Sequence, residues 1–172
     1  MTGAAPLKAQ VLFAAHRDGV FRYLCRIVGP TEATDLTQEV FLRVARSPVP
    51  DTTSDGERAW VFRIARNLAL NYRRDTSRRP ETEALSDAAR PPAQESAAAM
   101  REALDRLAPL DRDVFLLREV AGLSYDEIAA SCEISHGAVR TRLHRARQQL
   151  REQLRPRMND GTGSVVRLYD TR

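Results

Sequence analysis

The sequence predicts an all-α protein made of two small helical domains joined by a flexible linker, the second a four-helix domain that contains a helix-turn-helix. Three observations predict this. Apolar residues recur at helical spacing in both halves of the 172-residue chain, without the alternation typical of strands. Most Gly and Pro residues fall between these periodic segments. Residues 76–96, rich in Pro, Ala, Ser, Glu and Arg, contain few large apolar side chains, which favours a linker.

The chain divides accordingly into a first domain over residues 6–75, a flexible linker over 76–96, a second domain over 97–157 and a disordered tail over 158–172. Periodicity predicts seven helices, over residues 8–28 (with an interruption expected near Gly19), 32–46, 57–74, 97–107, 109–120, 124–131 and 136–154. The loop 47–56 contains two prolines and a glycine and is expected to be irregular.

Composition restricts the classes of function. The net charge is only +4, but nearly all the positive charge is Arg, because Lys8 is the single lysine. Arginine is the better residue for bidentate contacts to phosphate and guanine, so the composition favours a polyanion partner. The two distant cysteines have no CxxC spacing, and the three histidines do not cluster with them. We therefore expect no metal and no cofactor. With no long apolar run and no leader-like N-terminus, the sequence predicts a cytoplasmic protein without membrane insertion.

The helix predicted over residues 57–74 combines an apolar stripe with arginines. Trp60, Ile64, Leu68 and Tyr72 lie four residues apart, and the middle two are expected to be core. Arg66 and Arg73 lie on the opposite face. The density of arginine at this end of the helix favours a nucleic-acid surface over a merely solvated one, and terminal aromatic rings can stack on unpaired bases.

The helix predicted over residues 32–46 has a polar face with one exposed apolar residue. Its apolar arc contains Leu36, Val40, Phe41 and Val44, and its opposite face carries the set Asp35, Gln38, Glu39 and Leu42. An exposed leucine among fixed polar groups is typical of a partner-binding face, although pattern alone also fits a solvated helix.

The helix-turn-helix is predicted over residues 123–151. Ser124 and Glu127 form a capping-box pattern, and Ser135 is placed to cap the last helix. Ile128, Ile134, Val139 and Leu143 are expected to form the small core between the two helices. An exposed face rich in Arg and polar residues then lies where such a helix contacts the major groove of DNA. A solvated basic face is the simpler alternative for the arginines alone.

Together these segments resemble the extracytoplasmic-function (ECF) RNA polymerase sigma factors. Residues 35–43 (DLTQEVFLR) resemble the polymerase-binding helix of that family, and residues 60–67 (WVFRIARN) resemble its promoter-melting segment. Residues 123–129 (LSYDEIA) with 137–147 (GAVRTRLHRAR) resemble its second DNA-binding domain. The resemblance covers about residues 7–154, in the family's order.

The resemblance implies roles for individual residues. The polymerase-binding residues would be Asp35, Gln38, Glu39 and Leu42. The residues at the −10 element, together with the loop 47–56, would be Trp60, Arg66, Asn67, Asn71, Arg73 and Arg74. The residues at the −35 element would be His136, Arg140, Thr141, Arg142, His144 and Arg145. Many family members carry Asp at the position of Asn71, so −10 contacts here can differ.

The implied protein is an alternative sigma factor, not an enzyme, which binds core RNA polymerase and promoter DNA under the control of an anti-sigma factor. Two other hypotheses remain open at this stage. A conventional helix-turn-helix regulator would bind its site without polymerase, and a sigma mimic would bind another regulator and DNA only weakly. The sequence shows no nucleophile–base pair, glycine-rich phosphate loop or metal-ligand spacing that would favour an enzyme.

Overall fold

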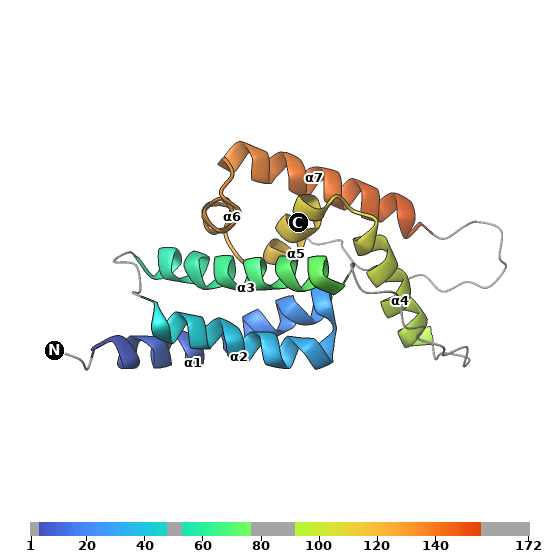
Figure 1. Ribbon diagram of the computed structural model, residues 1–172. Coiled ribbons are helices and arrows are strands. Elements are labelled where there is room, and N and C mark those ends of the chain that lie inside the picture. The colour runs from blue at the N-terminus through green and yellow to red at the C-terminus, as the bar shows by residue number, and fades with distance from the viewer. Residues whose placement is uncertain (1–3, 48–52, 77–91, 156–172) are drawn as a thin grey trace.

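The computed structural model describes residues 4–47, 53–76 and 92–155 of the chain, with side chains from Lys8, Thr53 and Ser96 onward in these segments. Helices α1 (Ala4–Val28), α2 (Pro30–Arg46) and α3 (Ser54–Thr76) form a first unit (Figure 1). Helices α4 (Pro92–Asp105), α5 (Pro109–Glu119), α6 (Tyr125–Cys132) and α7 (His136–Gln153) form a second unit. The predicted all-α fold is confirmed.

The helices of the first unit differ from the sequence prediction at two places. Helix α1 continues through Gly19, where an interruption was expected. A β-carbon at Gly19 would lie 3.4 Å from Cζ of Phe62, at van der Waals contact, so α1 and α3 approach closely at this position. Helix α3 begins at Ser54, earlier than predicted and inside the expected loop 47–56. The N–H groups of Gly56 and Glu57 donate to the hydroxyl and carbonyl oxygens of Thr53, which gives the helix its start.

Helix α2 begins at a sharp turn that the dipeptide Gly29-Pro30 makes possible. Gly29 has φ of 94°, a left-handed conformation that side chains with a β-carbon rarely adopt. Pro30 occupies the first turn of the helix, where its missing N–H has no intrahelical partner to lose. The chain therefore reverses direction within one residue, and α1 and α2 pack side by side.

Helix α4 also begins at a proline, Pro92, five residues before the start predicted from periodicity. Its first residues belong to the stretch predicted as a linker. Residues 77–91 and the tail over 158–172 lie outside the described residues, so the linker, the tail and the domain boundaries stay predictions.

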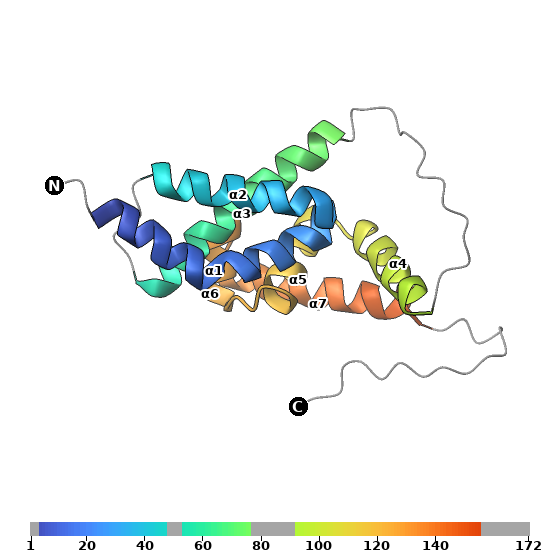
Figure 2. The ribbon, with the colours of Figure 1, turned by 90° about the horizontal axis from the view of Figure 1, so that it is seen from below.

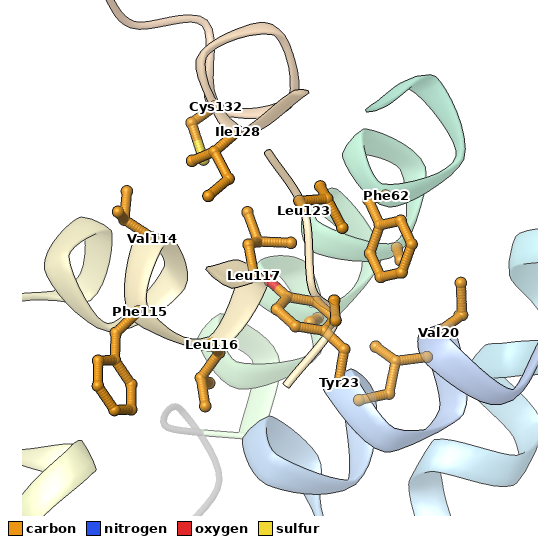
Figure 3. Packing of buried hydrophobic residues seen from close by; sticks show 14 of the residues in the cluster. Val20, Tyr23, Phe62, Val114, Phe115, Leu116, Leu117, Leu123, Ile128 and Cys132 are labelled. Atoms are coloured by element: carbon orange, nitrogen blue, oxygen red, sulfur yellow. The ribbon is translucent and has the colours of Figure 1, made fainter. Parts of the chain in front are cut away.

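The two units pack against one another along α3. Helix α3 lies between α1 and α2 on one side and α5 and α6 on the other (Figures 1 and 2). The buried apolar residues of both units form one continuous cluster. Figure 3 shows Leu123 of the second unit beside Phe62 of α3, and Tyr23 of α1 pointing toward Leu117 of α5. Burying an apolar side chain of this size stabilises a fold by about 1.5–3 kcal/mol, so the contact is energetically substantial.

The buried face of α3 is rotated slightly from the predicted stripe. Leu68 is buried as expected, but Ile64 is only half-buried, and Trp60 packs at the edge of the core. The buried residues of this helix are Ala59, Val61, Phe62, Ala65, Leu68 and Ala69. The reason is that α3 is covered on two sides, by its own unit and by α6, so small residues such as Ala59 and Ala65 become core.

Candidate functional site

The polar face of α2 is exposed as the sequence predicts. Val40, Phe41 and Val44 are buried against α1 and α3, which directs the other side of the helix outward. Asp35 and Gln38 are exposed, and Leu42 leaves 47% of its surface in solvent. Glu39 accepts a hydrogen bond from Nε of Arg43 at 2.7 Å, one turn later on the same helix. The four predicted polymerase-binding residues therefore share one accessible surface.

The C-terminal half of α3 presents some of its predicted DNA-binding residues and covers others. Asn67, Asn71 and Arg74 are exposed. Arg73 is partly exposed and lies 3.1 Å from the carboxylate of Asp105 on α4. Trp60, farther toward the N-terminus of the helix, is half-buried.

Arg66 lies on the same side of α3 as Arg73, and both contact the second unit. Only 17% of its side chain is exposed, and its Nε donates to Oδ2 of Asp113 at 2.9 Å. Asp113 belongs to α5 and is buried, with 1% of its side chain exposed. Burial raises the pKa of Asp113 above its usual value, and the guanidinium of Arg66 opposes that shift. An arginine predicted to hold DNA is thus engaged by the other unit in this arrangement.

Further polar contacts join the N-terminal half of α3 to the second unit. Arg58 donates to the carbonyl oxygen of Ala121 at 2.6 Å and to both carboxylate oxygens of Glu127 at 3.4 Å. The hydroxyl of Ser131, which is buried, lies 2.9 Å from the carbonyl oxygen of Ala59 and 2.7 Å from that of Glu127, one turn earlier on α6. We refer to these bonds, the Arg66–Asp113 pair and the apolar packing around them as the α3 contact.

The helix-turn-helix has the predicted internal structure. Ser124 accepts from the N–H of Glu127 at 3.2 Å, and the carboxylate of Glu127 accepts from the N–H of Ser124 at 2.6 Å, which completes the capping box. Ser135 accepts from the N–H of Ala138 at 3.2 Å and caps α7. Val139 and Leu143 are buried with Ile128, while Ile134 is partly buried beside them.

The exposed side of α7 carries the residues predicted for the −35 element. Arg140, Thr141 and His144 are exposed, on the side away from the buried stripe. His136, in the first turn, packs its ring 5.4 Å from the ring of Tyr125. Arg142 and Arg145 differ from the rest, because both contact the buried carboxylate of Asp111 at 2.8 Å.

Sequence reasoning missed three consecutive charged residues at the start of α5. Asp111, Arg112 and Asp113 are all buried, and each is paired with a different helix. Asp111 contacts α7, Arg112 lies 3.2 Å from Asp105 of α4, and Asp113 contacts α3. A charged run placed directly before the apolar residues 114–117 was the available signal, since α5 is short and central in the second unit. Arg58, Glu127 and Ser131 were missed as inter-unit contacts for want of any local signal.

Within the part of the chain that the structure describes, none of the helices is long and apolar enough to span a membrane. The same residues contain no group of three or more His, Cys, Asp or Glu side chains that could hold a metal ion. The described residues thus form three candidate binding surfaces. Those on α3 and α7 are rich in arginine, and the one on α2 combines polar residues with an exposed leucine.

Comparison with known proteins identifies the family of each unit. Residues 12–79 match the family model of sigma-70 region 2, and residues 97–150 match that of sigma-70 region 4. The fold also resembles two solved structures. CnrH, in complex with the cytosolic domain of CnrY, has a TM-score of 0.66 and 26% identity, over 85% of this chain and 86% of CnrH. RpoE of Bartonella quintana, in complex with the anti-sigma factor NepR, has a TM-score of 0.65 at 22% identity, over 86% and 97% of the two chains.

Proteins of similar sequence identify the family within the sigma-70 group. The chain is 37% identical over 155 residues to the ECF RNA polymerase sigma factor SigE of Mycolicibacterium smegmatis, covering 83% of the chain and 60% of SigE. It is 32% identical over 165 residues to the ECF sigma factor SigL of Mycobacterium tuberculosis, covering 88% of the chain and 93% of SigL. The chain belongs to the ECF family of RNA polymerase sigma factors.

Proposed function

We propose that this protein binds core RNA polymerase and directs it to promoters by recognising a −10 and a −35 element. The observation that carries the proposal is the capped helix-turn-helix of α6 and α7, whose exposed side presents Arg140, Thr141 and His144. It follows, in the same chain, a unit that matches sigma-70 region 2. Phosphate contacts would position α7 in the major groove, and base-edge contacts would specify the sequence.

The face of α2 with Asp35, Gln38, Glu39 and Leu42 is the proposed polymerase-binding surface. Its support is geometric, because an exposed leucine surrounded by polar groups on a rigid helix has the composition of an interface centre with a polar rim. This surface belongs to α2, and the polar bonds of the α3 contact are made by other helices.

The proposed −10 surface lies along α3. Asn67 and Asn71 are exposed and can reach DNA directly, and Arg74 is exposed on the same half of the helix. Arg66 is placed differently, because its guanidinium faces Asp113. Its proposed role in holding the DNA backbone therefore requires α5 to move away from α3. The α3 contact and promoter binding are then competing states of one molecule.

We propose further that the two units are separate domains joined through residues 77–91, and that an anti-sigma factor regulates them in the cytoplasm. Support comes from the solved structures of CnrH and RpoE, which contain the cytosolic domain of CnrY and the anti-sigma factor NepR. Two weakly binding DNA surfaces on one tether would act together through effective concentration once polymerase fixes their spacing.

The experiment that tests the proposal is in vitro transcription with sigma-free core polymerase on fragments of the source genome, with and without the protein. We expect start sites that depend on the protein and share −10 and −35 sequences. Tight, specific DNA binding by the protein alone, with no polymerase binding, would instead identify a conventional regulator. Polymerase binding without transcripts on any fragment would favour a sigma mimic.

A further inference from the structure

A buried carboxylate lies directly behind the recognition helix. Asp111 is in the first turn of α5, and 1% of it is exposed. Each of its two oxygens is held by a different arginine of α7: Nη1 of Arg142 lies 2.8 Å from Oδ1, and Nε of Arg145 lies 2.8 Å from Oδ2. The contact of Arg142 is a charge-assisted hydrogen bond, and the contact of Arg145 is an ion pair.

The two arginines are not equally committed to this carboxylate. The side chain of Arg142 is 30% exposed, and that of Arg145 is 51% exposed. Arg145 contacts Asp111 through Nε, the nitrogen nearest its aliphatic stem. Because Nε lies between the aliphatic stem and the two terminal nitrogens, the ion pair restricts where those two nitrogens can lie. Those two nitrogens are the ones that make bidentate bonds to guanine or phosphate.

We propose that Asp111 is a positioning residue for −35 recognition, which restrains the side chain of Arg145 on the DNA-facing side of α7 through an ion pair, with Arg142 as the second anchor. This inference rests on the proposed function and deepens it, because it names the residue that orients the reading group. When a long side chain is ordered before binding, less conformational entropy is lost as it contacts DNA. Affinity and base discrimination therefore both increase.

A neighbouring ion pair provides a matched control. Glu119, at the other end of α5, accepts from Nη2 and Nε of Arg147 at 2.6 and 3.2 Å. This pair also joins α5 to α7, but Arg147 is outside the set predicted to read the −35 element. Removing it tests the loss of an α5–α7 ion pair without disturbing Arg145.

The test is in vitro transcription with the full chain and core polymerase, on promoters that carry each base substitution across the −35 element. For Asp111→Asn we expect discrimination at the base pair nearest Arg145 to fall roughly tenfold, since the neutral amide no longer forms an ion pair with Arg145. Discrimination at the −10 element should persist. Glu119→Gln should keep the wild-type −35 profile. A general loss of transcription with an unchanged −35 profile would show a merely structural role and overturn the inference.

A second variant covers the case in which Asp111→Asn does not fold. Arg145→Lys keeps the positive charge but has no planar fork, so −35 discrimination should fall while the salt dependence of binding stays the same. A wild-type profile from Arg145→Lys would overturn the inference. If wild-type protein itself gave transcripts indifferent to the −35 sequence, the proposed −35 recognition would fail, and the role of Asp111 with it.

Discussion

Glu133, in the turn between α6 and α7, adopts a left-handed backbone conformation with φ of 56°. It directly follows Cys132, the last residue of α6, at a position that glycine occupies in many helices because it has no β-carbon to clash. The side chain of Glu133 is 74% exposed and lies 3.4 Å from Arg63, an ion pair open to solvent. Solvent-exposed ion pairs contribute little to the free energy of unfolding. The cost of the left-handed backbone conformation therefore dominates at this position.

We therefore expect Glu133→Gly to raise the free energy of unfolding by about 1 kcal/mol. The measurement is equilibrium unfolding of the full chain in urea. Glu133→Ala is the control, because it removes the same ion pair and keeps the β-carbon, and it should not stabilise. Equal stabilisation by Gly and Ala would show that the backbone strain is not the cause.

Cys132, at the end of α6, is a second residue with a property set by its surroundings. It is buried, and burial raises the pKa of its thiol from 9.0 to about 11. At pH 8 the thiolate fraction is then about a hundredfold smaller than for an unperturbed thiol, and the thiolate is the reactive form. Cys25 is more exposed, so the two thiols should differ in reactivity.

With Cys25→Ser, which leaves Cys132 as the one thiol, we expect alkylation by iodoacetamide at pH 8 to be at least about a hundredfold slower in the folded chain than in urea. Mass spectrometry over time gives both rates. Cys132→Ser, which leaves Cys25, should show a smaller difference between the folded and unfolded chain. Rapid alkylation of folded Cys132 would mean that α6 opens readily.

At the scale of elements, the capping box of α6 is the clearest case of a local signal that fixes a helix start. Ser124→Ala removes the acceptor for the N–H of Glu127, and we expect the free energy of unfolding to fall by about 1 kcal/mol. Ser124→Asn retains a side-chain acceptor and should restore most of the loss. Urea unfolding of both variants makes the comparison, and equal losses would exclude the cap as the cause.

The positions of most helices could be predicted because their signals are local. The Ser124 and Ser135 caps and the buried stripe of α7 lie within a few residues of what they stabilise. The start of α3 was predicted late, because Thr53 caps it from inside a stretch that contains Pro and Gly. The exposure of the α2 face followed directly from its periodicity.

The contacts of side chains with distant partners could not be predicted in the same way. Arg66 has the pattern of a solvated arginine, and only the packing of α5 against α3 shows that it faces Asp113. The pairs Arg58–Glu127 and Ser131–Ala59 join residues about seventy positions apart. No periodicity links such positions, so the sequence left the arrangement of the two units open.

At the scale of the whole molecule, the α3 contact makes a prediction about shape. The buried hydroxyl of Ser131 faces the backbone of α3, where an arginine side chain has no room. Ser131→Arg should separate the units and increase the radius of gyration measured by small-angle X-ray scattering. Ser131→Ala loses only the hydroxyl and should keep the wild-type value.

The helical content of Ser131→Arg, measured by circular dichroism, should match that of the wild type, which distinguishes separation of the units from unfolding. An unchanged radius of gyration in a folded Ser131→Arg variant would contradict the assigned contact. An increase in Ser131→Ala as large as that in Ser131→Arg would show that the hydrogen bond, not the packing, holds the units together.

The contact between Arg66 and Asp113 also affects how tightly the free protein binds DNA. When a binding-competent state is populated only fractionally, the apparent dissociation constant is the intrinsic one divided by that fraction. If one molecule in a hundred lacks the α3 contact, the free protein binds promoter DNA about a hundredfold more weakly than its surfaces alone would allow. A partner that binds preferentially to the state without the α3 contact removes this reduction in affinity. Free protein molecules would then leave genomic DNA largely unoccupied. Molecules bound to such a partner would bind DNA with the intrinsic affinity of their surfaces.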